Sequence, residues 1–322
     1  MIETLSEFQA SLLPFLDPAK IHKATAEPGE PIPVVARFRK ILQEQNQSTA
    51  AGRERKGVDS AAGRSARPRL HIKAFGRFEV FRGATAIDVA EWGGKQPQLL
   101  LKALISREGR SVPKDVLIED LWPEVDTASG DRNFKVTLHR LRKALEPAAD
   151  RTEGSSYVHL RNHMVSLDGS LCHVDVDEFV SWCRNGRRSE EGRKAKEALS
   201  AYEKAVSVYE GDYLAEDLYA PWAAGRRERL RSEFLEVLYR MGALYEMAGS
   251  HKTAAECYAR LLRIDPASEQ ACQRLMIVYS NRGMRSAALK VYEDCKKALR
   301  DEIGVVPDTL TDSIYRKILE QE

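Results

Sequence analysis

The chain has 322 residues, of which 43% are hydrophobic, enough to form the cores of two or three domains. Its formal net charge is only +2, so total charge does not by itself indicate a nucleic-acid-binding protein. No apolar run approaches the ~20 residues that cross a bilayer, and no signal peptide opens the chain, so we expect a cytoplasmic protein without a membrane partner.

The first 68 residues divide into two parts of different composition. Apolar residues at helical spacing predict two short helices within residues 1–42, with a proline-rich segment between them. Residues 43–68 are rich in Gln, Ser, Ala, Gly and Arg, which predicts a flexible basic linker. The extension is too short for a phosphorylatable receiver domain. Its role stays open between dimerisation, signal reception and the remnant of a sensor module.

Residues 69–168 are predicted to form the next domain, which starts with strands and continues with helices. Residues 70–88 alternate apolar and polar side chains, with glycines at the turns, as short antiparallel strands do. Leucines at helical spacing predict a helix over residues 95–106. A second helix is predicted to begin with Pro113 in its first turn and to end near Trp122.

A third helix, predicted over residues 131–145, is the most informative part of this domain. Its buried stripe consists of Phe134, Leu138, Leu141 and Leu145. The candidate exposed residues are Arg132, Lys135, Val136, His139, Arg140, Arg142 and Lys143. Such a face suits a DNA major groove, because cations contact phosphates and guanine edges while an aliphatic group contacts a thymine methyl. A solvated basic helix with one stray valine is the alternative.

Two extended runs, residues 156–160 and 164–167, follow the third helix. The residues between them, Arg161, Asn162 and His163, suit a hairpin turn with a basic tip. Three helices that are closed by a hairpin and preceded by a small sheet describe a winged helix-turn-helix. In that fold the third helix enters the major groove, and the hairpin, or wing, contacts the adjacent backbone or minor groove.

Several segments resemble known families. VTLHRLRKAL at 136–145 is similar to the recognition helix of OmpR/PhoB-type winged-helix domains, and VLIEDLWP at 116–123 is similar to the helix before it. From about residue 169 onward, the chain resembles the bacterial transcriptional activator domain that follows this winged helix in SARP regulators (Streptomyces antibiotic regulatory proteins). The matching segments are VDVDEF at 174–179, GDYLAEDLYAPW at 211–222, RRERLRSEFLEVL at 226–238 and LLRIDPASEQACQRLMIVYSNRGMRSAALKVYEDCKKALRDEIGVVPD at 261–308.

The resemblance implies roles for individual residues. The positions that match base-edge contacts are Arg140 and Lys135, and those that match further groove contacts are Val136 and His139. The positions that match phosphate contacts are Arg132, Thr137, Arg142 and, at the start of the second helix, Lys114. The wing residues are further candidates, although the family is often more basic there. Trp122 matches a tryptophan near the DNA backbone, with core packing as the alternative.

Residues 169–322 contain an internal repeat of 34 residues. The pairs at this separation are Tyr245 and Tyr279, Gly249 and Gly283, Ala254 and Ala288, and Tyr258 and Tyr292. This is the period of tetratricopeptide repeats, in which small residues lie where two helices touch. An earlier half-repeat, formed by Ala198, Tyr202 and Ala205, keeps the internal spacing but is out of phase. We expect helical repeats whose tyrosines are core residues and whose concave surface binds a protein.

Other classes of function find little support in the sequence. It has no phosphate-binding loop, no GxSxG or HExxH motif and no GxGxxG after a strand, so we expect no enzyme and no cofactor. The five cysteines have no CxxC spacing, which favours reduced packing residues over disulfides or a zinc site. We predict that Asp175 and Asp177 cap the first helix of the repeat domain.

The sequence therefore predicts a mainly α protein with small β-sheets, in which a winged helix-turn-helix precedes a tetratricopeptide-like repeat domain. We expect a bacterial regulator that binds double-stranded promoter DNA and is nucleoid-associated when bound. The resemblance implies an activator that recruits RNA polymerase, with protomers side by side on direct repeats. The alternative is a protein-binding scaffold or signalling adaptor whose winged helix is an interaction module, and the cations of the third helix argue against it.

Overall fold

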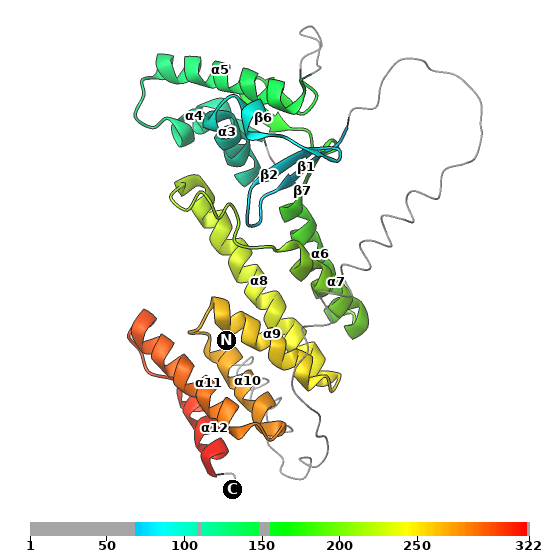
Figure 1. Cartoon of the computed structure of the whole chain (residues 1–322), viewed down its shortest axis with the longest axis vertical. Helices are drawn as coiled ribbons and strands as arrows, with labels where there is room; N and C mark the ends of the chain where they lie inside the picture. Colours follow the sequence, from blue (N-terminus) through cyan, green and yellow to red (C-terminus); the bar gives the residue numbers. More distant parts are fainter. Residues whose placement is uncertain (1–67, 108–110, 148–154, 321–322) are drawn as a thin grey trace, which may run out of the picture. The chain divides into compact units, whose positions relative to one another are not determined.

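The computed structural model describes residues 68–107, 111–147 and 155–320 (Figure 1). The predicted extension over residues 1–42 and all but the last residue of the predicted linker over 43–68 lie outside the described residues.

The described chain begins with a small sheet and three helices. The strands β1 (Leu70–Lys73), β2 (Glu79–Arg82) and β3 (Thr85–Ala86) form successive antiparallel pairs, as the alternating pattern predicts. After a 3₁₀ turn, η3 (Val89–Trp92), come the helices α3 (Lys95–Ser106), α4 (Lys114–Leu121) and α5 (Thr127–Leu145). The helix α5 begins before the predicted residue 131, because Asp126 caps it by accepting a hydrogen bond from the Ser129 amide (3.0 Å).

The wing is a three-stranded sheet. The strands β5 (Val158–Arg161) and β6 (Met164–Leu167) form the predicted hairpin, and β4 (Ser111–Pro113) pairs with the other edge of β6. The turn residues Asn162 and His163 have φ angles of +49° and +62°. Both central residues of a type I′ hairpin turn need positive φ. Because β4 leads directly into α4, the sheet places the start of that helix beside the wing.

The sheet that opens the winged helix is completed by residues that follow the wing. The strand β7 (Cys172–Val174) pairs in parallel with β1, giving the order β3-β2-β1-β7. Just beyond β1, the Leu214 amide donates to the Ala74 carbonyl (2.8 Å) and the Gly76 amide donates to the Asp212 carbonyl (3.1 Å). A fragment that ends at residue 168 would therefore leave β1 without two of its hydrogen-bonding neighbours.

Seven α-helices follow β7 in the described chain. They are α6 (Asp175–Glu191), α7 (Ala195–Val208), α8 (Pro221–Met247), α9 (His251–Ile264), α10 (Glu269–Asn281), α11 (Arg285–Ala298) and α12 (Thr309–Glu320), with a π-helical turn, η5 (Leu299–Ile303), before the last. Consecutive helices pack as the pairs α6–α7, α8–α9 and α10–α11, and α12 packs on α10 and α11 (Figure 1).

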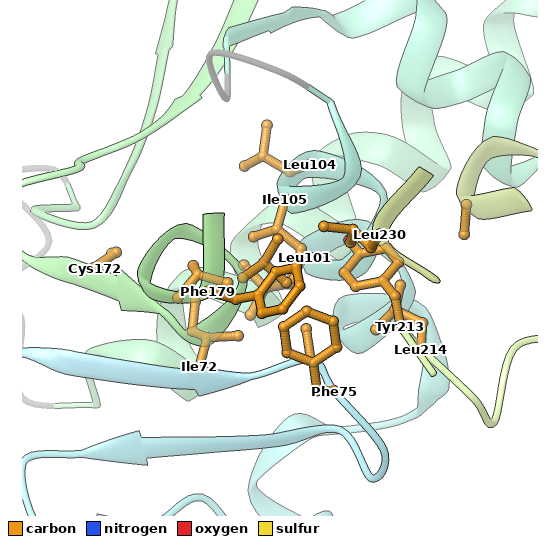
Figure 2. Close-up of a cluster of buried hydrophobic side chains, with 14 of the residues drawn as sticks. Ile72, Phe75, Leu101, Leu104, Ile105, Cys172, Phe179, Tyr213, Leu214 and Leu230 are labelled. Carbon is orange, nitrogen blue, oxygen red and sulfur yellow. The ribbon is translucent and has the colours of Figure 1, made fainter. Parts of the chain in front are cut away.

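One apolar core joins the winged helix to the first two helix pairs. Figure 2 shows its side chains converging from β1, β7, α3, α6, α8 and the connector, which we define as residues 209–220. The Phe75 ring lies 5.3 Å from the Phe179 ring and 4.6 Å from the Tyr209 ring, between centroids. Tyr209 in turn stacks on Phe234 at 4.0 Å. Residues on both sides of the predicted boundary at 168 therefore share one hydrophobic core.

Polar contacts cross the same boundary. The Lys102 ammonium on α3, whose side chain is only 6% exposed, forms a 2.6 Å ion pair with Asp217 of the connector. The hydroxyls of Ser106 and Tyr213 are hydrogen-bonded at 2.7 Å, and Arg226 on α8 donates to the Ile105 carbonyl (2.9 Å). A buried lysine requires such a partner, because an unpaired charge in the interior costs several kcal/mol.

The predicted capping role of Asp175 is wrong. The cap of α6 is Val174, and Asp175 is the first residue of the helix. One Asp175 carboxylate oxygen accepts hydrogen bonds from the amides of Ala74 (2.8 Å) and Phe75 (3.0 Å), and the other accepts one from its neighbour Val176. Burial raises the pKa of Asp175, against the lowering effect of these amides. The carboxylate therefore joins the end of β1 to α6.

The out-of-phase half-repeat of the sequence is a complete helix pair. Gly249 and Gly283, which link the helices of the second and third pairs, have φ angles of +73° and +70°. Arg193 lies at the equivalent position of the first pair, with φ +56°. The spacing from Arg193 to Gly249 exceeds 34 residues because the connector and the long N-terminal part of α8 intervene. The repeat domain thus contains three helix pairs.

The predicted small residues and tyrosines of the repeats are core residues. Ala254, Ala288, Tyr202 and Tyr258 are buried, and so are all five cysteines, which are free thiols. A Cβ atom added at Gly186 would lie 2.2 Å from the Tyr202 ring, and one added at Gly242 would lie 2.5 Å from the Tyr258 ring. Among the described residues, no helix has the length and apolar character needed to cross a membrane.

Gly242→Ala should destabilise the second helix pair, since the Tyr258 ring is fully buried and has no room to move away. We expect the free energy of unfolding to fall by about 1–3 kcal/mol, the usual cost of overpacking a core. The matched control is Gly225→Ala on the same helix, where the new methyl group meets only the end of the Arg229 side chain at 3.7 Å. That change should be neutral or stabilise by up to about 1 kcal/mol, because alanine favours helices. Urea unfolding measures both, and equal effects would contradict the close contact at Gly242.

Candidate nucleic-acid interface

The two faces of α5 differ sharply in exposure and charge. The predicted buried stripe is confirmed, because Phe134, Leu138, Leu141 and Leu145 are each at most 4% exposed. The helix packs through this stripe against α3 and α4. The exposed residues of the opposite face include Arg132, Lys135, Val136, His139, Arg140 and Lys143. Val136 is 51% exposed, so an aliphatic group does lie in the middle of the basic face.

A close contact at Gly130 fixes α5 against α4. A Cβ atom at this position would lie 2.7 Å from Cγ2 of Ile118 on α4. Glycine normally weakens a helix interior by about 1 kcal/mol, so its presence in the first turns of α5 signals a packing requirement. The sequence analysis did not single out Gly130, although an isolated glycine inside a predicted helix is the signal that could have revealed it.

Two arginines of the exposed face have local hydrogen bonds that orient them. Arg132 donates to the Ser129 hydroxyl (2.7 Å) one turn earlier on the helix. Arg140 donates to the Gly93 carbonyl at 3.4 Å, which places its guanidinium beside the turn that precedes α3. Gly93 has φ +64° and ends η3. Gly93 is thus a further residue of this surface that the sequence analysis missed.

Three predicted phosphate contacts have other roles in the structure. Thr137 is only 5% exposed and lies on the inner face of α5, so its assignment is wrong. Arg142 is half-buried, and its Nε donates to the Val158 carbonyl of β5 (3.1 Å), while burial lowers the pKa of its guanidinium. Lys114 forms a 2.7 Å ion pair with Asp131, and its side chain is 14% exposed. Arg142 therefore joins α5 to the wing, and Lys114 joins α4 to α5.

The wing tip is exposed and lies beside the start of α4. Arg161, Asn162 and His163 are all exposed, and the His163 carbonyl accepts a hydrogen bond from the Lys114 amide (2.8 Å). The structure therefore brings the wing candidates close to the N-terminal half of α5. Trp122 ends α4, is half-buried and packs against the core, as the packing alternative holds.

Arg142→Ala should lower stability, because the change removes a hydrogen bond and a half-buried stem between α5 and β5. We expect a loss of about 1–2 kcal/mol in the free energy of unfolding. The neighbouring exposed cation provides the control, and Lys143→Ala should stay within about 0.5 kcal/mol of the wild type. Chemical denaturation followed by circular dichroism measures both variants. A loss at Arg142 no larger than that at Lys143 would contradict the structural role.

Comparisons with known proteins agree with this geometry. Residues 94–159 match the family model "Transcriptional regulatory protein, C terminal", and residues 174–319 match the model "Bacterial transcriptional activator domain". Both models describe regulatory domains. They match, respectively, the helices and most of the wing, and the helical repeats from the end of β7 onward.

Curated relatives share both domains. Regulatory protein AfsR of Streptomyces coelicolor is 27% identical over 71% of this chain, but the match covers 22% of AfsR, so the chain spans less than a quarter of that relative. Transcriptional regulatory protein MoaR1 of Mycobacterium tuberculosis is 26% identical over 70% of the chain and 72% of MoaR1. Regulatory protein DnrI of Streptomyces peucetius is 24% identical over 70% of the chain and 84% of DnrI.

A solved structure has the same fold. Mycobacterium tuberculosis EmbR, determined in complex with a low affinity phosphopeptide, superposes with a TM-score of 0.66 over 79% of this chain and 66% of EmbR. The sequence identity is 19%, so this likeness concerns the fold. Together, the winged helix with its basic groove-facing helix, the three helix pairs and the two matched domains place the chain in the SARP family of DNA-binding transcriptional regulators.

Proposed function

We propose that this protein binds double-stranded promoter DNA through α5 and the wing, and that it activates transcription there. The observation that carries the proposal is the exposed face of α5, where cations surround the half-exposed Val136 while the opposite stripe packs into the core. Lysine and arginine neutralise phosphates, and an aliphatic side chain contacts the thymine methyl in the major groove. A helix that merely faced water would gain nothing from an exposed valine.

The proposed roles follow from position on this face. Arg140 and Lys135 read base edges, and Val136 and His139 make the further groove contacts. Arg132 and Lys143 contact phosphates, and the wing residues Arg161, Asn162 and His163 contact the adjacent backbone or minor groove. Lys114, Thr137 and Arg142 have no direct role in this assignment, since one is paired, one is buried and one supports the wing.

The partners beyond DNA are proposed from the domain pair. We infer that protomers bind side by side on direct repeats and that the helical repeats contact RNA polymerase, so that the protein acts at the nucleoid as a regulator rather than an enzyme. The shared core between the winged helix and the first helix pairs supports this proposal, because it would hold the repeats beside the promoter while α5 is bound.

Selection of bound sequences from a random pool of duplex DNA tests the DNA-binding function. The expected result is an enriched motif that recurs as a direct repeat, with binding that weakens steeply as salt increases. A reporter carrying that motif should then respond to the full chain. Absence of salt-dependent binding to any duplex would reject the proposal in favour of a protein-binding scaffold.

Arg140→Ala should weaken binding to the selected site by about 1–3 kcal/mol and relax base preference at one position of each half-site. The physical reason is the loss of a guanidinium that donates to a guanine edge. Arg184→Ala, which removes an exposed arginine from α6, is the matched control and should leave binding unchanged. Titration of the selected duplex and of single-base variants measures both effects. Unchanged affinity and base preference in Arg140→Ala would mean that α5 does not read the bases through this residue.

A further inference from the structure

The start of α4 contacts both of the other elements that face DNA. The Lys114 amide donates to the His163 carbonyl at the wing tip (2.8 Å), and the Lys114 ammonium lies 2.7 Å from the Asp131 carboxylate on α5. Asp115 lies farther from the ammonium, at 3.8 Å. Lys114 is therefore bound within the protein through both its backbone and its side chain.

Asp131 is the single acidic residue of α5, and it lies at the proposed DNA-facing end of the helix. The hydrogen bond from Lys114 is the main cause that lowers the pKa of Asp131, and the charges of Lys135 and His163 lower it further. The same hydrogen bond raises the pKa of Lys114. Asp131 is consequently ionised in the folded protein, next to a surface that is proposed to approach phosphates.

Lys135 follows Asp131 by four residues, a spacing at which side chains on a helix are neighbours. An unpaired Asp131 would therefore attract Lys135 as well as repel the DNA backbone. We propose that Lys114 is a positioning residue that neutralises Asp131, and so keeps Lys135 free for DNA, rather than a phosphate contact. This inference rests on the proposed function of α5.

The two roles of Lys114 predict different behaviour when Asp131 is also changed. If Lys114 acts through Asp131, Lys114→Met should weaken binding to a mixed-sequence duplex by about 5- to 10-fold, because one net charge is lost beside the phosphates. The double variant Lys114→Met/Asp131→Asn removes both charges and should bind within about 2-fold of the wild type, with the same salt dependence. If Lys114 contacts a phosphate, the double variant stays weak and its log–log salt slope falls by ~1.

The experiment measures fluorescence anisotropy of that duplex at several salt concentrations with the full chain. The decisive comparison is between wild type and the double variant, which has no unpaired charge, so it does not depend on the folding of Lys114→Met. Lys252→Met on α9 is the control for loss of an exposed lysine away from the winged helix. Thermal melts establish that each variant is folded.

A second measurement separates the positioning role from a purely structural one. Lys135→Ala should reduce affinity clearly in the wild type and less in the Lys114→Met background, where Lys135 is held by Asp131. Recovery of affinity in the double variant together with this non-additivity supports the inference. A double variant as weak as Lys114→Met overturns it while leaving DNA binding by α5 intact, whereas a wild type that binds no duplex overturns the proposed function itself.

Discussion

The parallel pairing of β7 with β1 is the constraint on which the arrangement of the described chain depends. Once β7 lies beside β1, α6 must start at the edge of the winged-helix sheet, where Asp175 accepts hydrogen bonds from the Ala74 and Phe75 amides. The connector then returns to the same place, with Leu214 bonded to Ala74. The aromatic side chains that meet there come from segments far apart in sequence, and their burial excludes water from these hydrogen bonds.

The helix α3 extends this constraint to the proposed DNA-binding face. One side of α3 carries the buried Lys102, which pairs with Asp217 of the connector, and α3 also packs against α8. It packs in addition against α5, so the recognition helix rests on an element that the repeat domain holds in place. A change in the connector has a direct packing route to α5 through α3, since close-packed interiors transmit displacement.

The proposed interface itself is a set of exposed cations whose geometry is fixed from behind. Gly130 lets α4 and α5 approach closely, Arg142 ties the end of α5 to β5, and Lys114 ties the start of α4 to both α5 and the wing. Residues that resemble phosphate contacts in the sequence thus supply the internal support of the surface. The distinction matters because a bound phosphate and an internal carbonyl both favour the same residue types, arginine and lysine.

The sequence by itself determined the order and type of most elements. The amphipathic pattern of α5, the alternation in β1 and β2, and the 34-residue period are local or periodic features, and the structure has them where the sequence predicts them. The fold class and the exposed candidates Arg132, Lys135, Val136, His139, Arg140 and Lys143 follow from the same patterns, because burial of one helix face dictates which residues lie on the other.

Only the tertiary structure decided the pairings between distant segments. Nothing in the local pattern of Asp175 indicates that its partners are the amides of Ala74 and Phe75, about a hundred residues earlier. Arg193 hides the first repeat because it occupies a left-handed position that glycine fills in the other two, and the connector shifts the phase. Thr137, Arg142 and Lys114 changed role for the same reason: a side chain's partner depends on which surface packs against its helix, and packing is set by the whole chain.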